Sequence, residues 1–472
     1  MPIFTVGAAG TTSDSGFNVD NSLRFDSTQG TYLSLNQSTA TSARKMTFST
    51  WVKLSKLDDY NILMENVSSP HASQVVIEDN GNGNDLRFYD YDGSTNLDFR
   101  TSMGFRDVSA WYHIVVAMDT EQATASNRVK IYVNGSRLTE FDTETYPSQN
   151  YDTGITNGTL QIGRQGSNIY YIDGYLAETC FIDGQQLDPT SFGEFDSDTG
   201  IWKPIEIDVS GITFGNNGFY LDYENSGALG TDAAGSNNLT TNNITAVDQS
   251  TDTPTNNFCT LNLLTARGGG TFDEGNLKYT ASTGDSSIFG TIGIPPGMKV
   301  YFEVKLTNNT AQNAIGIHNQ YDPGGTFVKG GSASGMYSFK PRGSASVTQY
   351  FNNGSSTNTS TSNYANDTII GVAVDNENGQ IHYSANGTYL NSSDPTDNNP
   401  AALVTGFGGS SEQYLHFSLD TTTSQPINQF NFGSPPYAIS SGNSDGNGHG
   451  NFEYAVPSGY YALNSKNLAE FG

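Results

Sequence analysis

The sequence predicts an all-β protein of two β-sandwich (jelly-roll) domains in series, joined by an irregular connector. Short segments that alternate apolar and polar residues recur along the chain, and turns rich in Asn, Gly and Asp separate them. The chain has 52 Gly, 26 Tyr and 26 Phe, so turns are frequent and a few large rings can fill a thin core. No long stretch repeats apolar residues at the helical period.

The first sandwich is predicted at residues 21–205, after an N-terminal arm of small and polar residues at 1–20. Its strand-like segments begin at Leu23–Phe25 and follow one another at short intervals. In Val129–Val133 the apolar residues share one face, and Asn134-Gly135 then supplies the positive φ of a tight hairpin turn. Regular short strands of this kind are typical of a sandwich or jelly roll.

Residues 206–258 are less regular, and we predict a connector that wraps over a surface. The second sandwich is predicted at residues 259–472, including a C-terminal tail with enough aromatic residues to dock on it. In Val300–Leu306 the alternation places Phe302 inward and Glu303 outward.

Net charge excludes one class of partner. The chain has 48 acidic and 21 basic residues and a net charge of −27, so a nucleic acid or an anionic membrane would be repelled. The amino terminus lacks a basic region followed by an apolar one, so we expect no signal peptide, and no apolar run has membrane-spanning length. Cys180 and Cys259 do not imply a disulfide framework; two buried thiols are expected, with one bridge as the alternative.

Tyrosines in predicted loops are the candidate ligand-binding residues, because an aromatic face can stack on a sugar ring. The candidates are Tyr89, Tyr91, Tyr170 and Tyr171. Trp51 and Trp111 lie in apolar segments, and we expect them in the core rather than in a sugar site.

Two oxygen-rich turns are candidate metal sites, because calcium prefers several hard oxygen ligands. The candidate ligands are Asp79, Asp85, Asp90 and Asp92. The spacing lacks the bidentate Glu of an EF-hand loop, so exposed hairpin turns without metal are the alternative. Calcium is thus the single candidate cofactor. The six histidines lack metal-ligand spacing, and His382 is expected to point outward from its strand.

Catalysis is not expected. Glu194 and Asp196 resemble a glycosidase pair, but retaining enzymes hold two carboxylates about 5 Å apart in a cleft, and this run has the composition of a loop. No Ser/His/Asp order, P-loop or dinucleotide fingerprint is present. We therefore predict a protein that is not an enzyme.

Two sets of segments resemble known families. Residues 20–205 resemble a laminin-G/concanavalin-like jelly roll. The resemblance is carried by the order and spacing of six segments: Ser22–Asp26, Phe48–Val52, Trp111–His113, Ile131–Gly135, Leu160–Gly163 and Ile172–Ala177. Residues 285–435 resemble a SPRY domain. The segments that carry this resemblance are Tyr301–Val304, Ile315–Ile317, Asp367–Asp375, Ile381–Gly387 and Asn431–Gly433. The first resemblance implies binding of glycans or proteins, sometimes through calcium. The second implies a recognition module that uses loops at one end of the sandwich.

The connector has a resemblance of its own. It is similar to a stretch of sequence that is common in virion proteins of marine bacteriophages. The segments that carry this similarity are Asp183–Pro189, Phe192–Asp196, Trp202–Pro204, Gly218–Asp222 and Asp252–Phe258. This implies a structural protein on the virion exterior, made in the host cytoplasm: a tail fibre, a tail appendage or a head decoration.

The virion context implies particular partners. They are other virion proteins, host surface polysaccharide and further copies of the chain in a homo-oligomer, which is assumed to be a trimer. A cellular lectin or adhesin with the same modules is the alternative, followed by a polysaccharide-degrading enzyme.

Overall fold

The structure is a computed structural model, and it describes residues 16–57, 59–68, 71–79, 81, 83–155, 158–166, 170–282, 284–321, 334–342, 347–397, 401–420 and 425–472. The chain divides into two compact units, Ser15–Thr255 and Asn256–Gly472. Each unit has its own hydrophobic core and is described by itself.

The first unit consists of two antiparallel sheets. One sheet has the order β10 (Ser136–Arg137), β9 (Val129–Val133), β8 (Tyr112–Asp119), β3 (Lys45–Leu54), β13 (Gly174–Asp183), β1 (Ser22–Phe25) and β18 (Gln249–Ser250), and β16 (Phe219–Leu221) also pairs with β13. The other has the order β11 (Phe141–Thr145), β7 (Thr95–Gly104), β6 (Asp85–Tyr91), β5 (His71–Glu78), β4 (Tyr60–Ser68), β12 (Thr159–Ile162), β2 (Tyr32–Asn36) and β17 (Thr240–Asn242). A separate hairpin joins β14 (Gly193–Phe195) to β15 (Trp202–Pro204), and short 3-10 turns lie at Ala125–Asn127, Pro189–Ser191 and Ala246–Asp248.

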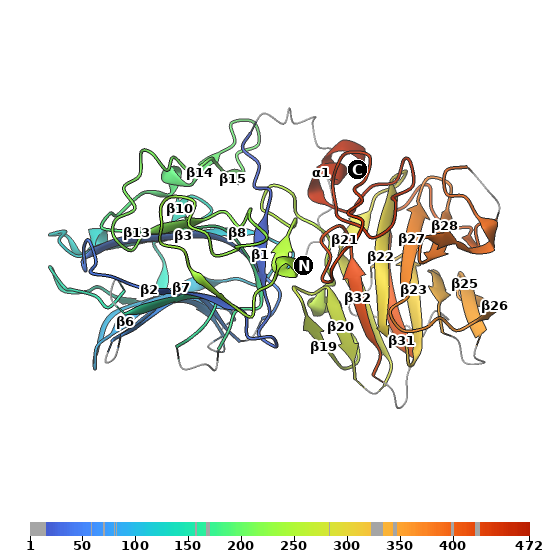
Figure 1. Cartoon of the computed structure of the whole chain (residues 1–472), viewed down its shortest axis with the longest axis horizontal. Helices are drawn as coiled ribbons and strands as arrows, with labels where there is room; N and C mark the ends of the chain where they lie inside the picture. The colour runs from blue at the N-terminus through green and yellow to red at the C-terminus, as the bar shows by residue number, and fades with distance from the viewer. Residues whose placement is uncertain are drawn as a thin grey trace. The chain divides into compact units, whose positions relative to one another are not determined.

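The core of this unit lies between its two sheets, which Figure 1 shows as stacked layers. Successive residues of a strand point to opposite faces, so each strand gives alternate side chains to the core. Phe48 and Val116 contribute from one sheet, and Leu33, Phe88 and Leu160 contribute from the other. The alternate residues of β6, β5, β4, β12 and β2 therefore lie on the outer face of the second sheet.

The segment predicted as a connector, residues 206–258, adds strands to the first unit as far as Thr255. β16 pairs with β13, β17 with β2, and β18 with β1. Asp252, which follows β18, forms an ion pair of 2.7 Å with Lys53, and both side chains are 1% exposed. Trp111 Nε1 also donates to the Asp252 carboxylate at 3.1 Å. The segment thus closes the edge of the sandwich.

The second unit also consists of two antiparallel sheets. One has the order β19 (Gly270–Asp273), β20 (Lys278–Ala281), β32 (Ile427–Asn431), β22 (Lys299–Asn308), β27 (Ile369–Asp375), β28 (Gln380–Ala385) and β29 (Thr388–Tyr389), with β30 (Val404–Thr405) also pairing with β28. The other has the order β21 (Ser286–Ile294), β31 (Gln413–Asp420), β23 (Gln312–His318), β24 (Met336–Lys340), β25 (Val347–Asn352) and β26 (Ser355–Ser362). Short 3-10 turns lie at Leu263–Thr265 and Leu390–Ser392, and a short helix of about two turns, α1 (Ser465–Phe471), follows the Asn464 N-cap.

The C-terminal segment packs on the outer face of the sheet that contains β22. Phe452 and Tyr460 join Tyr301 and Ala373 in a small apolar cluster there. This cover explains a difference from the sequence prediction for His382. His382 does lie opposite Ile381 and Tyr383, but it is 1% exposed, because the face it points to is covered rather than solvated.

The observed architecture confirms the predicted all-β fold of two β-sandwiches. Cys180 and Cys259 are both buried thiols, as expected. Within the described ranges, no helix combines the length and the apolar character that crossing a membrane requires.

Candidate functional site

A polar row crosses the outer face of the second sheet of the first unit. Strand register places Tyr89 of β6 opposite Gln74 of β5, and Gln74 opposite Glu65 of β4. Glu65 in turn lies opposite Gln161 of β12, and Gln161 opposite Ser34 of β2. Directly paired residues of antiparallel strands share one face, so these five side chains form a continuous row, called here the polar row.

Aromatic rings and one arginine close the β2 end of the polar row. The Arg164 guanidinium lies 4.3 Å from the ring centroid of Tyr32 and 5.8 Å from that of Tyr171. The Tyr32 and Tyr171 rings meet edge to face with centroids 6.4 Å apart. Tyr170 packs its ring on Tyr60, with centroids 4.3 Å apart. The face therefore offers aromatic surfaces beside hydrogen-bonding groups.

The centre of the polar row is buried although it lies on the outer face. Gln74, Glu65 and Gln161 are 3%, 4% and 9% exposed. Gln74 Nε2 donates to Glu65 Oε1 at 2.5 Å, and the Gly166 N–H donates to the other carboxylate oxygen. Burial raises the pKa of the Glu65 carboxyl above its ordinary value, and these two hydrogen bonds oppose part of the rise. Burial also raises the pKa of Tyr89 to about 12, so its hydroxyl is protonated at neutral pH.

Two polar atoms at this site have no hydrogen-bond partner among the described residues, which omit residues 167–169. They are Gln161 Oε1 and Arg164 Nε, and both residues are 9% exposed. A buried polar group without a partner costs about 1–3 kcal/mol, so such groups are exceptional and need an explanation. Amide, carboxylate and guanidinium groups beside aromatic faces are the groups that bind hydroxyl-rich ring compounds.

The structure places three of the four predicted tyrosines in or beside the polar row and the fourth outside it. Tyr89 belongs to the polar row, and the Arg87 guanidinium lies 4.5 Å from its ring centroid. Tyr170 and Tyr171 lie at the Arg164 end, as described above. Tyr91 ends β6 and is 42% exposed, outside the row.

The four predicted metal ligands form two separate groups. Asp79 and Asp85 flank the turn between β5 and β6, and Asp90 and Asp92 lie at the other end of β6. A strand rises about 3.3 Å per residue, so the two groups are too far apart to share one ion. Asp90 accepts hydrogen bonds from Tyr151, at 2.7 Å, and from Ser73 and Gly154. No group of three or more His, Cys, Asp or Glu suited to a metal is found among the described residues, which omit Asn80 and Asn82. Calcium binding stays a prediction.

Glu194 and Asp196 lie on and after β14, on the exposed hairpin. Lys203 Nζ lies 3.4 Å from the Glu194 carboxylate and 3.1 Å from that of Asp196. Hydrogen bonds from Thr199 and Lys203 hold the pKa of Asp196 well below its ordinary value. A glycosidase acid needs a raised pKa, which is the opposite of the shift at Asp196.

His113 and Ser49 form a buried pair that resembles a catalytic dyad but has the wrong tautomer. Trp202 Nε1–H donates to His113 Nδ1 at 2.9 Å, so the neutral ring carries its proton on Nε2. That nitrogen therefore donates to Ser49 Oγ, 2.9 Å away, and cannot take the hydroxyl proton. Burial lowers the pKa of His113 to about 3, which keeps the ring neutral. The pair is part of the packing between Trp51 and Trp202.

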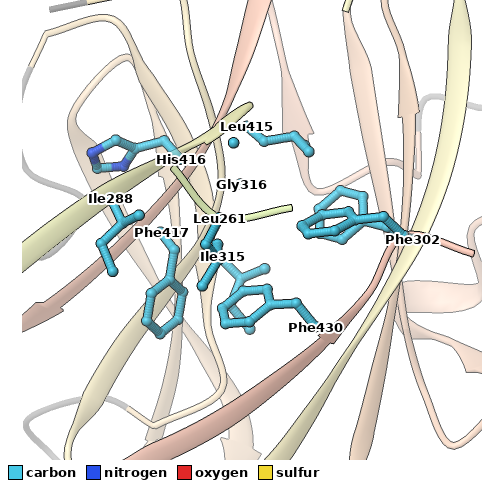
Figure 2. Close-up of a pocket in the computed structure, with 11 residues that line it drawn as sticks. Leu261, Ile288, Phe302, Ile315, Gly316, Leu415, His416, Phe417 and Phe430 are labelled. Atoms are coloured by element: carbon cyan, nitrogen blue, oxygen red, sulfur yellow. The ribbon is translucent and has the colours of Figure 1, made fainter. Parts of the chain in front are cut away.

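A small cavity lies inside the core of the second unit (Figure 2). Its volume is about 10 Å³, and its lining is apolar, with Phe302, Phe417 and Phe430 among the residues. A space of this size holds one water at most, so it is a packing gap and not a ligand site. Figure 2 shows the His416 imidazole directed away from Phe302 and Phe430, toward the other face of its sheet.

The sequence prediction missed Gln74, Glu65, Gln161, Arg164 and Tyr32. Their alternation with core residues was a usable signal that they lie on one face. It did not say which strands are neighbours, and the row exists only through that order.

Two family models match the chain. Residues 26–185 match the concanavalin A-like lectin/glucanases superfamily, and residues 299–421 match the SPRY domain. The chain therefore holds a concanavalin A-like domain followed by a SPRY domain. The polar row belongs to the concanavalin A-like domain, since its residues lie between Ser34 and Gln161.

Solved structures are similar to parts of the chain. The SPRY domain of human HERC1 is 13% identical, with 36% of this chain and 96% of that chain covered and a TM-score of 0.27. A putative carbohydrate binding protein from Bacteroides ovatus is 17% identical, with 48% and 59% covered and a TM-score of 0.33. A SAP-like pentraxin from Limulus polyphemus is 15% identical, with 36% and 80% covered and a TM-score of 0.26. No curated protein matches the sequence.

Proposed function

We propose that this protein is a non-enzymatic carbohydrate-binding protein whose concanavalin A-like domain binds glycan at the polar row. The observation that carries this proposal is a pair of buried side chains beside two aromatic rings. Gln161 and Arg164 each have a polar atom with no partner among the described residues, and they lie beside the rings of Tyr32 and Tyr171. Sugar hydroxyls would hydrogen-bond to the amide and guanidinium groups, and a sugar ring would stack on a tyrosine face. The superfamily match is consistent with such a role.

Binding of the purified protein to a panel of bacterial surface polysaccharides tests this proposal. We expect saturable binding that falls at least tenfold in Arg164→Ala, because the variant removes both the guanidinium and its contact with Tyr32. Arg137→Ala is the matched control, since Arg137 is an exposed arginine of the same domain whose side chain bonds only to the Ser126 carbonyl. Equal loss in both variants, or binding unchanged in Arg164→Ala, would place the glycan elsewhere.

The same panel with a calcium chelator tests the predicted metal sites. Loss of binding on chelation, restored by added calcium, would support a site that includes Asp79 or Asp92. The polar row has no cluster of carboxylates, so binding at the row is expected to survive chelation.

The non-enzymatic part of the proposal rests on the Lys203 ion pairs that hold Glu194 and Asp196. Release of reducing ends from a bound polysaccharide, abolished by Glu194→Gln, would contradict it.

A virion role, on the particle exterior with other virion proteins as partners, is supported by the sequence of residues 183–258 alone. A stoichiometric band of this protein in purified particles is its test, and a cellular lectin or adhesin is the alternative.

A further inference from the structure

A second hollow lies at one end of the SPRY domain. Its volume is about 470 Å³, and it is lined by Asn319, Gln320, Tyr321, Ser411, Glu412 and Tyr414. β23 and β31 are antiparallel neighbours, with His318 opposite Tyr414. The residues that follow β23 therefore meet the residues that precede β31 at the same end of the sheet.

Two tyrosine rings form adjacent walls of this hollow. The ring centroids of Tyr321 and Tyr414 lie 5.5 Å apart, with 46° between the ring planes. Phe289 of β21 meets Tyr321 edge to face with centroids 5.3 Å apart, which supports that wall from behind. Both rings are thus held by packing before any ligand arrives, which reduces the entropy cost of binding.

A carboxylate stands beside the two rings, and within the described ranges no ion pair joins it to a lysine or arginine. Glu412 Oε2 accepts the Tyr414 hydroxyl at 2.8 Å, which fixes its direction. The ion pairs of the described SPRY residues join Lys278, Lys299 and Lys305 to other carboxylates. Among the described SPRY residues, the Glu412 carboxylate is therefore paired with a hydroxyl donor and with no lysine or arginine.

We propose that this hollow binds the guanidinium group of an arginine side chain on a partner polypeptide. A cation over a tyrosine face is attracted by the ring quadrupole, and a guanidinium can stack on one ring while it donates to a carboxylate. Asn319 and Gln320 also line the hollow, and their side chains contain amide oxygens that can accept hydrogen bonds. The net charge of −27 favours the approach of a basic partner.

Calorimetric titration of the full-length protein tests the proposal. The probe is the peptide acetyl-Gly-Arg-Gly-amide, and acetyl-Gly-Gln-Gly-amide is the uncharged comparison. We expect saturable binding of the arginine peptide and no binding of the glutamine peptide. Acetyl-Gly-Lys-Gly-amide is expected to bind several-fold more weakly, because an ammonium lacks the planar face that stacks.

Matched variants assign the binding to this hollow. Glu412→Gln keeps an oxygen acceptor for Tyr414 and removes only the charge, and we expect at least a tenfold weaker affinity. Tyr321→Leu removes one wall and is expected to act similarly. Glu470→Gln removes the same charge from α1, which does not line the hollow, and is expected to bind like the unmodified chain.

Three results would overturn the proposal: no saturable binding of the arginine peptide, equal binding of the glutamine peptide, or equal affinity in Glu412→Gln and Glu470→Gln. An unchanged melting temperature in Glu412→Gln excludes loss of folding as the cause of weaker binding. Glycan binding through the concanavalin A-like domain is measured in parallel and is independent of this outcome.

Discussion

Glu178 is a buried acid held in an unusual conformation. It has a φ of +50° within an irregular register of β13 and is 5% exposed. The Tyr220 hydroxyl donates to its carboxylate at 2.6 Å. Burial raises the pKa of Glu178 from 4.5 to about 8, so the side chain is largely protonated at neutral pH.

The stability of the protein is therefore expected to fall as pH rises from about 4.5 to about 8. Between these values the folded chain keeps a proton that the unfolded chain has released, which favours unfolding. Glu178→Gln removes this dependence and is expected to stabilise the protein at pH 8 by a few kcal/mol, since one pKa unit corresponds to about 1.4 kcal/mol. Urea unfolding at pH 5 and pH 8 measures it, with Asp222→Asn as the control. If the free energy of unfolding falls by the same amount between pH 5 and pH 8 in both variants, the pH dependence belongs to other groups.

The buried His113 side chain depends on Trp202 for one of its two hydrogen bonds. Trp202→Phe keeps an aromatic ring of similar packing and leaves Nδ1 without a donor. We expect a loss of about 1–3 kcal/mol in the free energy of unfolding. Denaturant midpoints measure the loss, and a change below about 0.5 kcal/mol would mean that water replaces the indole N–H.

At the scale of elements, one glutamate fastens the C-terminal segment to β22. Glu303 is fully buried and accepts hydrogen bonds from the Tyr454 N–H at 2.8 Å and the Glu453 N–H at 3.0 Å. It also accepts from Tyr301 at 3.1 Å and from Asn431 at 3.2 Å. The sequence prediction that Glu303 faces away from the core holds, but the tail covers that face, so the outward carboxylate becomes an anchor.

Glu303→Gln is expected to loosen this segment. The amide places an NH₂ group where the carboxylate accepted donors, so at least one buried N–H loses its acceptor, at a cost of about 2–4 kcal/mol. Hydrogen exchange is expected to rise at the Glu453 and Tyr454 amides before it rises in β22. The exposed Glu377→Gln is the comparison variant. Unchanged protection at both amides would show that apolar contacts alone hold the tail.

The buried Lys53–Asp252 ion pair holds the segment after β18, as Glu303 holds the C-terminal segment. Asp252→Ala removes the carboxylate that pairs with the buried Lys53 ammonium and is expected to cost about 3–5 kcal/mol. Lys53→Met combined with Asp252→Ala is expected to regain part of this loss, because no uncompensated charge remains. A double-mutant cycle of unfolding free energies measures the coupling, and additive losses would contradict it.

For the whole molecule, the charge of −27 sets the expected response to polyanions. The protein is expected to pass through a heparin or DNA column at about 0.05 M salt without retention, because no excess of cations is available to release counterions. Retention that decreases with salt would reveal a local basic surface that the total charge conceals.

The sequence by itself determined the class of fold. Period-two alternation in Val300–Leu306, hairpin dipeptides such as Asn134-Gly135 and the order of segments from Ser22 to Ala177 are local properties, and local sterics and burial act on them directly. Tyr170 and Tyr171 were also named from the sequence, because aromatic residues in loops are visible there, and their role in binding stays a prediction.

Only the tertiary structure decided the sites. The polar row needs β6, β5, β4, β12 and β2 as neighbours in one register, and alternation does not encode strand order. The hollow of the SPRY domain joins Tyr321 to Glu412 across about ninety residues of chain for the same reason. Burial of Glu303 depends on a tail that covers an outward face, and a strand pattern cannot show what packs on its polar side.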